Sequence, residues 1–178
     1  SLLAVQLASR VAASFQVDVR DERQVTRLFR DVGRSRCPVR VLVNNAGAAE
    51  DGLAMLMSLR KWRSVLELDL DATFLCCRAA LKVMAKDRIG SIVNIASVSG
   101  VFGSPGQANY SAAKAGVIAL TKSLSREVGG YGIRVNAVAP GFVRGSMASA
   151  APREVVDMYV AASSLKRIAE PVEVARVV

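Results

Sequence analysis

The sequence predicts an α/β fold built around a parallel sheet, and two patterns indicate it. Short apolar runs alternate with segments of ten or more residues that have helical periodicity, which is typical of β-α-β units. One run, Val39-Arg-Val-Leu-Val43, is almost continuously apolar, as expected for a strand buried on both faces of a sheet. No internal repeat or linker interrupts the 178 residues, so we expect residues 1–178 to form a single domain.

The predicted strands are short and end in polar or turn-forming residues. They cover residues 14–19, 39–43, 89–96 and 133–139. The predicted helices have one apolar face, as between Glu22 and Val32, or begin with proline in their first turn, as at Pro152 and Pro171. They cover residues 22–32, 59–86 (as more than one helix), 109–128, 152–163 and 171–178.

Composition limits the partners that this chain could have. Its hydrophobic content of 52% is enough for a core, but no apolar run reaches the roughly 18 residues that span a bilayer, so we expect no membrane insertion. The net charge is +9, which is compatible with nucleic acid or an acidic partner. The basic residues are scattered, however, and only 5% of residues are aromatic, so we expect no nucleic-acid binding.

Cysteine and histidine usage excludes several kinds of chemistry. The three cysteines, Cys37, Cys76 and Cys77, form no Cys-x-x-Cys motif and are typical of reduced thiols in an intracellular protein. The absence of histidine excludes Ser-His-Asp and Cys-His catalysis and weakens any proposal of a zinc site, so we expect no metal. We expect a cytoplasmic protein. An organellar location stays open, because the chain begins at Ser1 and a targeting peptide cannot be judged.

Polar residues follow four of the predicted strands and indicate a binding site at one edge of the sheet. They are Asp18, Asn44-Asn45-Ala46-Gly47, Ser97 and Pro140-Gly141. Ligands of open parallel sheets bind beyond the carboxyl ends of the strands, and all four groups lie at such ends.

A tyrosine and a lysine on the long predicted helix could perform acid–base chemistry. Tyr110 and Lys114 are four residues apart, so they lie on one helix face. A nearby ammonium favours the phenolate and is expected to lower the tyrosine pKa, while Ser97 could orient a substrate carbonyl. The alternative is that Tyr-x-x-x-Lys is an accident of an amphipathic helix.

In these motifs and their spacing the chain resembles the short-chain dehydrogenase/reductase family. Within the family it is most similar to the 3-oxoacyl-[acyl-carrier-protein] reductases of fatty-acid synthesis. Three further stretches carry that likeness: Gly106 to Gly116, Arg134 to Phe142 and Glu170 to Ala175. The resemblance implies a Rossmann-type doubly wound parallel sheet, present here without its first two strands and its last strand. The glycine-rich unit would then precede Ser1 by the roughly 40 residues of such a unit.

The resemblance also implies roles for individual residues. Ser97 would polarise the substrate carbonyl, Tyr110 would donate the proton, and Lys114 would assist it. The cofactor would be NADP, with NAD not excluded, and the substrate a thioester of acyl-carrier protein. The implied cofactor-binding residues are Asp18, Val19, Asn45, Ala46, Gly47, Tyr110, Lys114, Pro140, Gly141 and Val143.

Assembly and docking are implied in the same way. The family is commonly tetrameric, so we expect a homotetramer formed partly through the helices that hold residues 74–86 and 109–128. Lys82, Lys86 and Arg88 are candidates for docking an acidic carrier protein, or else a solvated helix end.

Two departures from the family leave other functions open. Asp69 stands where the family usually has Asn, and Gly145 where it usually has Thr. The chain could instead be a reductase of another small ketone, sugar or steroid, or a catalytically degenerate subunit of a reductase oligomer.

Some of the candidate residues also have purely structural interpretations. Asp18 could cap a helix. Asn44 could tie two strands together, and Ser97 could be a turn residue. Gly47 could serve a turn that needs positive φ.

Overall fold

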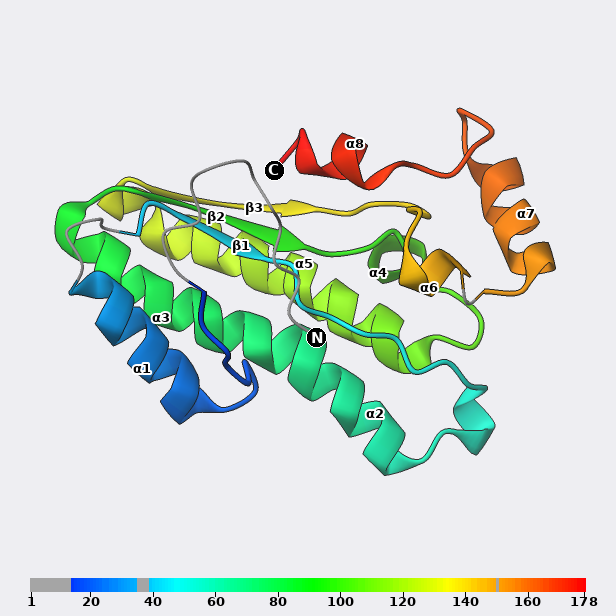
Figure 1. The fold of residues 1–178 in the computed structure, drawn as a ribbon, viewed down its shortest axis with the longest axis horizontal. Coiled ribbons are helices and arrows are strands. Elements are labelled where there is room, and N and C mark those ends of the chain that lie inside the picture. Colours follow the sequence, from blue (N-terminus) through cyan, green and yellow to red (C-terminus); the bar gives the residue numbers. More distant parts are fainter. Residues whose placement is uncertain (1–13, 35–38, 150) are drawn as a thin grey trace.

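The computed structural model describes residues 14–34, 39–149 and 151–178. Its centre is a parallel sheet of β1 (Val41–Asn44), β2 (Gly90–Ile95) and β3 (Ile133–Val138), in that spatial order (Figure 1). The register pairs Val43 with Val93 and Val93 with Asn136, so all three strands end at the same edge. The predicted α/β class and parallel sheet are confirmed.

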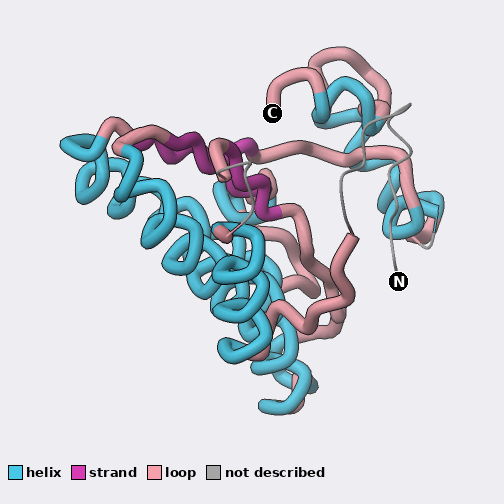
Figure 2. Tube along the Cα trace, turned by 60° about the vertical axis from the view of Figure 1, so that its left-hand side comes forward, coloured by secondary structure: helices cyan, strands magenta, loops and turns pink. Residues whose placement is uncertain are grey.

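Helices α1 (Glu22–Gly33), α2 (Leu59–Leu66), α3 (Ala72–Asp87) and α5 (Ala108–Val128) lie on one side of the sheet, as Figures 1 and 2 show. Four further helices follow β2 and β3: α4 (Ser99–Phe102), α6 (Ser146–Ser149), α7 (Arg153–Ala162) and α8 (Pro171–Ala175). Two short 3₁₀ turns cover Ala54–Leu56 and Gly129–Tyr131. The carboxyl ends of the strands therefore open toward α4, α6 and α7 (Figure 1).

The main core lies between the sheet and the helices beneath it. Its buried residues come from α1, α3, α5, β2 and β3, and include Phe29, Cys77, Met84, Ile92 and Leu124. The two described cysteines, Cys76 and Cys77, are buried free thiols. Cys37 lies outside the described residues.

Strand β1 differs from the expectation of burial on both faces. Val41 and Val43 are 58% and 42% exposed, and their neighbours in the strand are half-buried. Because successive side chains of a strand point to opposite faces, this alternation means that only one face of β1 is covered within the described residues.

The predicted strand over residues 14–19 is wrong. Residues 14–18 have no ladder partner in the described structure, and Val19 and Arg20 form a turn before α1. The turn closes because the Asp21 N–H donates to the Asp18 carbonyl, 3.1 Å away. The residue that caps α1 is Asp21, whose carboxylate accepts from the N–H groups of Arg23 and Gln24, so Asp18 is not a helix cap.

A π-helical turn (η2) over Glu67–Asp71 joins α2 to α3 without a break in the chain's helical path. Such turns insert one extra residue into a helix and are frequent at functional sites. Here the turn buries Asp69 completely, although the residues before and after it are at least partly accessible. Its carbonyl accepts a hydrogen bond from the Thr73 hydroxyl at 2.7 Å, which helps to satisfy the widened turn.

Two searches of the described residues give negative results. None of their helices has the length and apolar character needed to cross a bilayer. No cluster of three or more histidine, cysteine, aspartate or glutamate side chains in the same ranges is placed to hold a metal ion.

Candidate active site

The site begins where β2 and β3 end. Their pairing continues past the strands, because Ala96 donates to the Val138 carbonyl at 2.8 Å and Val98 donates to the Pro140 carbonyl at 3.0 Å. These bonds place Ser97 beside Pro140. The Ser97 hydroxyl is buried and accepts the N–H of Ser99, 3.1 Å away, which orients it at the start of α4.

Tyr110 and Lys114 reach this edge from α5. The helix can approach closely because Gly100 of α4 packs against the Lys114 backbone, and a Cβ at Gly100 would lie only 2.6 Å from the Lys114 carbonyl carbon. The Lys114 ammonium lies 5.5 Å from the centre of the Tyr110 ring. The Ser97 side chain acts on the Tyr110 phenol, since it favours the ionised form of that group. The structure thus brings the three predicted catalytic residues together.

The expected lowering of the Tyr110 pKa is wrong. Burial of the phenol raises its pKa, because the phenolate is poorly solvated there. Hydrogen bonding by Ser97 opposes this rise, while negative charge at Asp69 adds to it. The Lys114 ammonium does not compensate, since its charge is already matched by Asp69.

Asp69 and Lys114 form a buried ion pair. Asp69 Oδ2 lies 3.1 Å from Lys114 Nζ, and the two side chains are 0% and 6% exposed. The other oxygen, Oδ1, accepts the Ala48 N–H at 2.9 Å. Lys114 Nζ also donates to the Ile95 carbonyl at 3.1 Å, which ties the lysine to the end of β2. Burial nevertheless raises the Asp69 pKa, with Lys114 and the Ala48 N–H acting against that rise.

Gly47 is required by this ion pair. A Cβ there would lie 3.0 Å from Asp69 Oδ2 and 3.1 Å from Lys114 Nζ, which is tighter than ordinary contact. Its φ is not positive, so the interpretation as a left-handed turn is wrong. The preceding Asn44 ties β1 to β2, because its amide donates to Asn94 Oδ1 at 2.8 Å.

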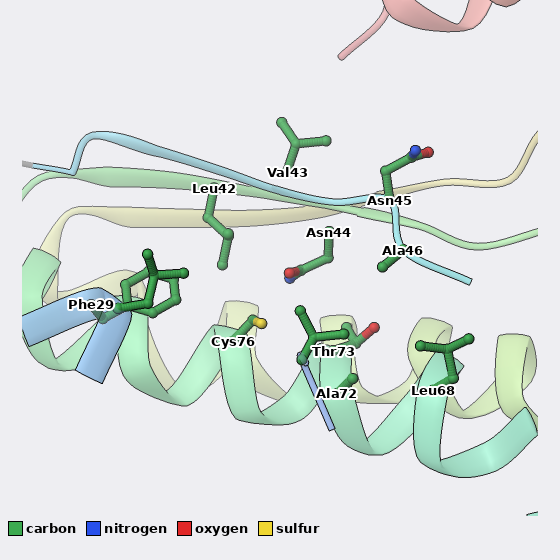
Figure 3. A pocket seen from close by; sticks show the side chains of 12 residues that line it. Phe29, Leu42, Val43, Asn44, Asn45, Ala46, Leu68, Ala72, Thr73 and Cys76 are labelled. Carbon is green, nitrogen blue, oxygen red and sulfur yellow. The ribbon is translucent and has the colours of Figure 1, made fainter. Parts of the chain in front are cut away.

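A cavity of about 210 Å³ lies between α1, β1 and α3 and joins three of the predicted cofactor-binding residues: Val19, Asn45 and Ala46. In Figure 3, Ala46 lies on the α3 side of the strand, and the Asn45 side chain points to the opposite face of the sheet. The cavity is mostly apolar, with Leu42 and Phe29 among its lining residues. The cavity thus lies mainly between the sheet and the helices beneath it, and only Asn44, Asn45 and Ala46 bring it to the carboxyl end of β1.

Asp18 precedes Val19, which lines this cavity. The Asp18 carboxylate, however, already binds Arg20. Arg20 makes two side-chain hydrogen bonds to it, at 2.9 and 2.8 Å, and its backbone N–H makes a third at 3.0 Å. These bonds lower the Asp18 pKa to about 2. A ligand amino group at Asp18 would therefore have to share the carboxylate with Arg20.

The loop after β3 presents the backbone of Val143 toward the site. Val143 pairs with Ala169, and the bonds of this bridge are made by the Phe142 carbonyl and the Arg144 N–H, at 2.9 and 2.8 Å. In parallel pairing the residue between two such groups turns its own N–H and C=O the other way. Val143 can therefore offer both groups to a ligand, next to Pro140 and Gly141.

The candidate docking residues lie at the edge of the sheet opposite Ser97. Lys82 and Lys86 belong to the last turns of α3, and Arg88 follows it, just before β2 begins. Ser97 follows the other end of this six-residue strand, roughly 20 Å away. This separation favours a solvated helix end over a carrier-protein docking site beside Ser97.

One residue at the site was missed from the sequence. Tyr159 of α7 reaches the loops after β2 and β3, where its ring stacks on Phe142 and its hydroxyl lies 3.2 Å from Ser104 Oγ. A lone tyrosine in an amphipathic helix gives no signal of this, because only the fold brings α7 to those loops.

This arrangement is that of a dinucleotide-binding α/β domain with a serine, a tyrosine and a lysine at the carboxyl edge of its sheet. The chain matches, over residues 2–178, a family model described as "Enoyl-(Acyl carrier protein) reductase". It belongs to the short-chain dehydrogenase/reductase family, which implies a nicotinamide cofactor.

Several curated relatives are similar over most of this chain. It is 42% identical over 164 residues to the 3-oxoacyl-[acyl-carrier-protein] reductase of Synechocystis sp., which covers 92% of this chain and 65% of that protein. It is 39% identical to the 3-oxoacyl-[acyl-carrier-protein] reductase FabG of Thermotoga maritima, covering 92% and 67%, and 40% identical to that of Staphylococcus aureus, covering 93% and 67%. The chain thus spans about two thirds of the length of these relatives.

Proposed function

We propose that the full-length protein is an NADPH-dependent 3-oxoacyl-[acyl-carrier-protein] reductase. The observation that carries this proposal is that Ser97, Tyr110 and Lys114 come together at the carboxyl edge of a parallel sheet, with the Lys114 ammonium 5.5 Å from the centre of the Tyr110 ring. The names of the relatives supply the substrate class.

In this proposal Ser97 and Tyr110 have separate catalytic roles. Ser97 donates a hydrogen bond to the ketone oxygen and so polarises the carbonyl. Tyr110 donates its phenolic proton to the same oxygen as the alcohol forms. Because the Tyr110 pKa is raised, the phenol is protonated at neutral pH, which is the form that reduction requires. A bound nicotinamide supplies the hydride that adds to the carbonyl carbon.

The cofactor would lie along the edge from the cavity to the loop after β3. Val19, Ala46 and the backbone at Asn45 would border the adenosine end. Pro140, Gly141 and the free backbone groups of Val143 would border the nicotinamide end. Gly145 has no hydroxyl with which to bind the nicotinamide end. The contacts there would therefore depend more on the backbone of Val143.

The test is turnover by the full-length protein. We expect NADPH to be oxidised with an acetoacetyl thioester far faster than with glucose or a steroid ketone, and faster than NADH is. A crotonyl thioester, the enoyl counterpart, should give little turnover. Equal or greater rates with the sugar, the steroid or the enoyl thioester would contradict the proposed substrate class.

The second candidate, a catalytically degenerate subunit, is favoured by one observation. Asp69 holds the Lys114 ammonium, which the family uses to assist the tyrosine. A nucleotide titration and a turnover assay on the same preparation separate the two: binding without any turnover supports the degenerate subunit.

Assembly and location belong to the same proposal. We place the protein in the cytoplasm as a homotetramer, with α3 and α5 at the contacts between subunits. Phe74 of α3 is 41% exposed and Arg78 lies over its ring, which gives α3 an accessible apolar surface. Sedimentation of the full-length protein at micromolar concentration should show a tetramer, and a stable monomer would contradict this assembly.

The Asp69→Asn variant should shift the pH profile of the reverse reaction. In the oxidation direction Tyr110 must be ionised, so activity rises as the pH passes its pKa. Asp69 disfavours that ionisation, and its removal also frees the Lys114 charge to favour the phenolate, so both effects lower the Tyr110 pKa. We expect the rising limb of the pH profile to move to lower pH, with no loss of peak activity.

The matched control for this prediction is Asp51→Asn. Asp51 also acts on the Tyr110 pKa, but after Asp69 and Tyr159 in size, and its side chain is exposed. The shift in this variant should therefore be smaller. An unchanged profile in Asp69→Asn would show that the Asp69 carboxyl carries no charge while Tyr110 titrates.

A further inference from the structure

Tyr159 is held at both ends of its side chain. Its ring stacks on Phe142, with ring centres 4.8 Å apart and planes 11° from parallel. Its hydroxyl lies 3.2 Å from Ser104 Oγ, in the loop between α4 and α5. The side chain thus bridges the loop after β3 and the segment after β2, the two segments that frame the candidate active site.

The hydroxyl contact continues inward to the catalytic serine. Ser104 Oγ donates to Ser99 Oγ at 2.9 Å, and the Ser99 N–H donates to Ser97 Oγ at 3.1 Å. Tyr159 is also near enough to Tyr110 to contribute to the rise of its pKa. The hydroxyl of Tyr159 is thus linked through Ser104 and Ser99 to Ser97, the residue proposed to bind the substrate carbonyl.

The remaining inward side of α7 is aliphatic. Val155, Val156 and Val160 are half-buried together with Tyr159, while Arg153, Glu154 and Asp157 are exposed on the other side. The wall that α7 offers to the site is thus apolar, with a single hydroxyl that is already engaged by Ser104. Such a wall suits a hydrocarbon chain and has no free charge for a sugar or an acid.

We propose that Tyr159 is a specificity-determining residue that limits the length of the apolar arm on the substrate carbonyl. This inference rests on the proposed function. A substrate held at Ser97 and Tyr110 would lie between the two segments that Tyr159 bridges, so an arm that extends toward α7 would meet the Tyr159 ring. The protein as it stands therefore prefers short acyl chains, and a smaller side chain at position 159 admits longer ones.

The test compares kcat/KM of the full-length protein for an acetoacetyl thioester and a long-chain 3-oxoacyl thioester. Because one methylene in an apolar pocket changes selectivity by about tenfold or more, Tyr159→Ala should raise the long-to-short ratio by at least about tenfold. Tyr159→Phe keeps the stacked ring and should keep the wild-type ratio. Tyr159→Leu, which keeps a large apolar side chain, repeats the test if the alanine variant does not fold.

Tyr131→Ala is the matched control, because Tyr131 is exposed and lies at the opposite edge of the sheet, just before β3, near Arg88. It should leave the ratio and the NADPH affinity unchanged. A ratio within about twofold of wild type in both Tyr159→Ala and Tyr159→Leu would overturn the inference alone. No turnover of either thioester by the wild-type protein would overturn the proposed function, and the inference with it.

Discussion

Replacing Tyr110 with phenylalanine lowers kcat for carbonyl reduction by about 10²–10⁴, because the reaction loses its proton donor. The substitution removes one oxygen and keeps the ring, so Lys114 keeps its contacts with Asp69 and with the Ile95 carbonyl. NADPH affinity should therefore change little. The measurements are steady-state turnover of an acetoacetyl thioester and a titration of NADPH binding, both with the full-length variant.

The control for this variant is Tyr131→Phe, which makes the same chemical change at an exposed tyrosine on the opposite edge of the sheet. Its turnover should match that of the wild type. If Tyr110→Phe retained more than about a tenth of wild-type kcat, the proton would have to come from another group, and the proposed role of Tyr110 would be wrong.

The parts of the fold that depend on local patterns could be predicted. Apolar runs gave β1, β2 and β3 to within two residues, and the periodicity of residues 22–32 and 109–128 gave α1 and α5. The convergence of Ser97 with Tyr110 and Lys114 was implied by the family resemblance, because Tyr110 and Lys114 lie on a helix and not at a strand end.

What failed depends on contacts between residues far apart in the chain. Residues 14–18 have the composition of a strand, but a strand also needs a neighbour to pair with, and the Asp18–Arg20 contacts form a turn instead. The expected fall of the Tyr110 pKa assumed a free lysine. The resemblance singles out Asp69 as a departure from the family, but the direct contact of its carboxylate with Lys114, forty-five residues further along the chain, depends on the fold. Tyr159 was missed for the same reason.

Replacing Lys114 with methionine should lower the free energy of unfolding by about 3–5 kcal/mol, which is a large part of the stability of an ordinary domain. Asp69 Oδ2 is fully buried and has no hydrogen-bond partner among the described residues, so its compensation comes from the Lys114 ammonium. Methionine fills a similar volume but leaves the carboxylate uncompensated. Urea unfolding of the full-length variant measures the loss.

The double variant Asp69→Asn/Lys114→Met shows whether the lost free energy of unfolding comes from an uncompensated buried charge or from lost packing. Each new side chain has nearly the volume of the one it replaces, and the buried negative charge is gone. The double variant should therefore recover at least about 2 kcal/mol of the unfolding free energy that Lys114→Met loses. Arg153→Met is the control for a broken ion pair as such, because the Arg153–Asp157 pair is exposed and should cost less than about 1 kcal/mol.

Equal losses in the double variant and in Lys114→Met would contradict this account, since the cost would then come from the lysine side chain and its bond to the Ile95 carbonyl. Recovery in the double variant would show that Asp69 requires a cation beside it. The lysine would then serve two purposes in this chain: it lies beside the tyrosine that moves the proton, and it makes the burial of Asp69 tolerable. The family's usual asparagine at that position carries no charge, so its lysine would be free of the second purpose.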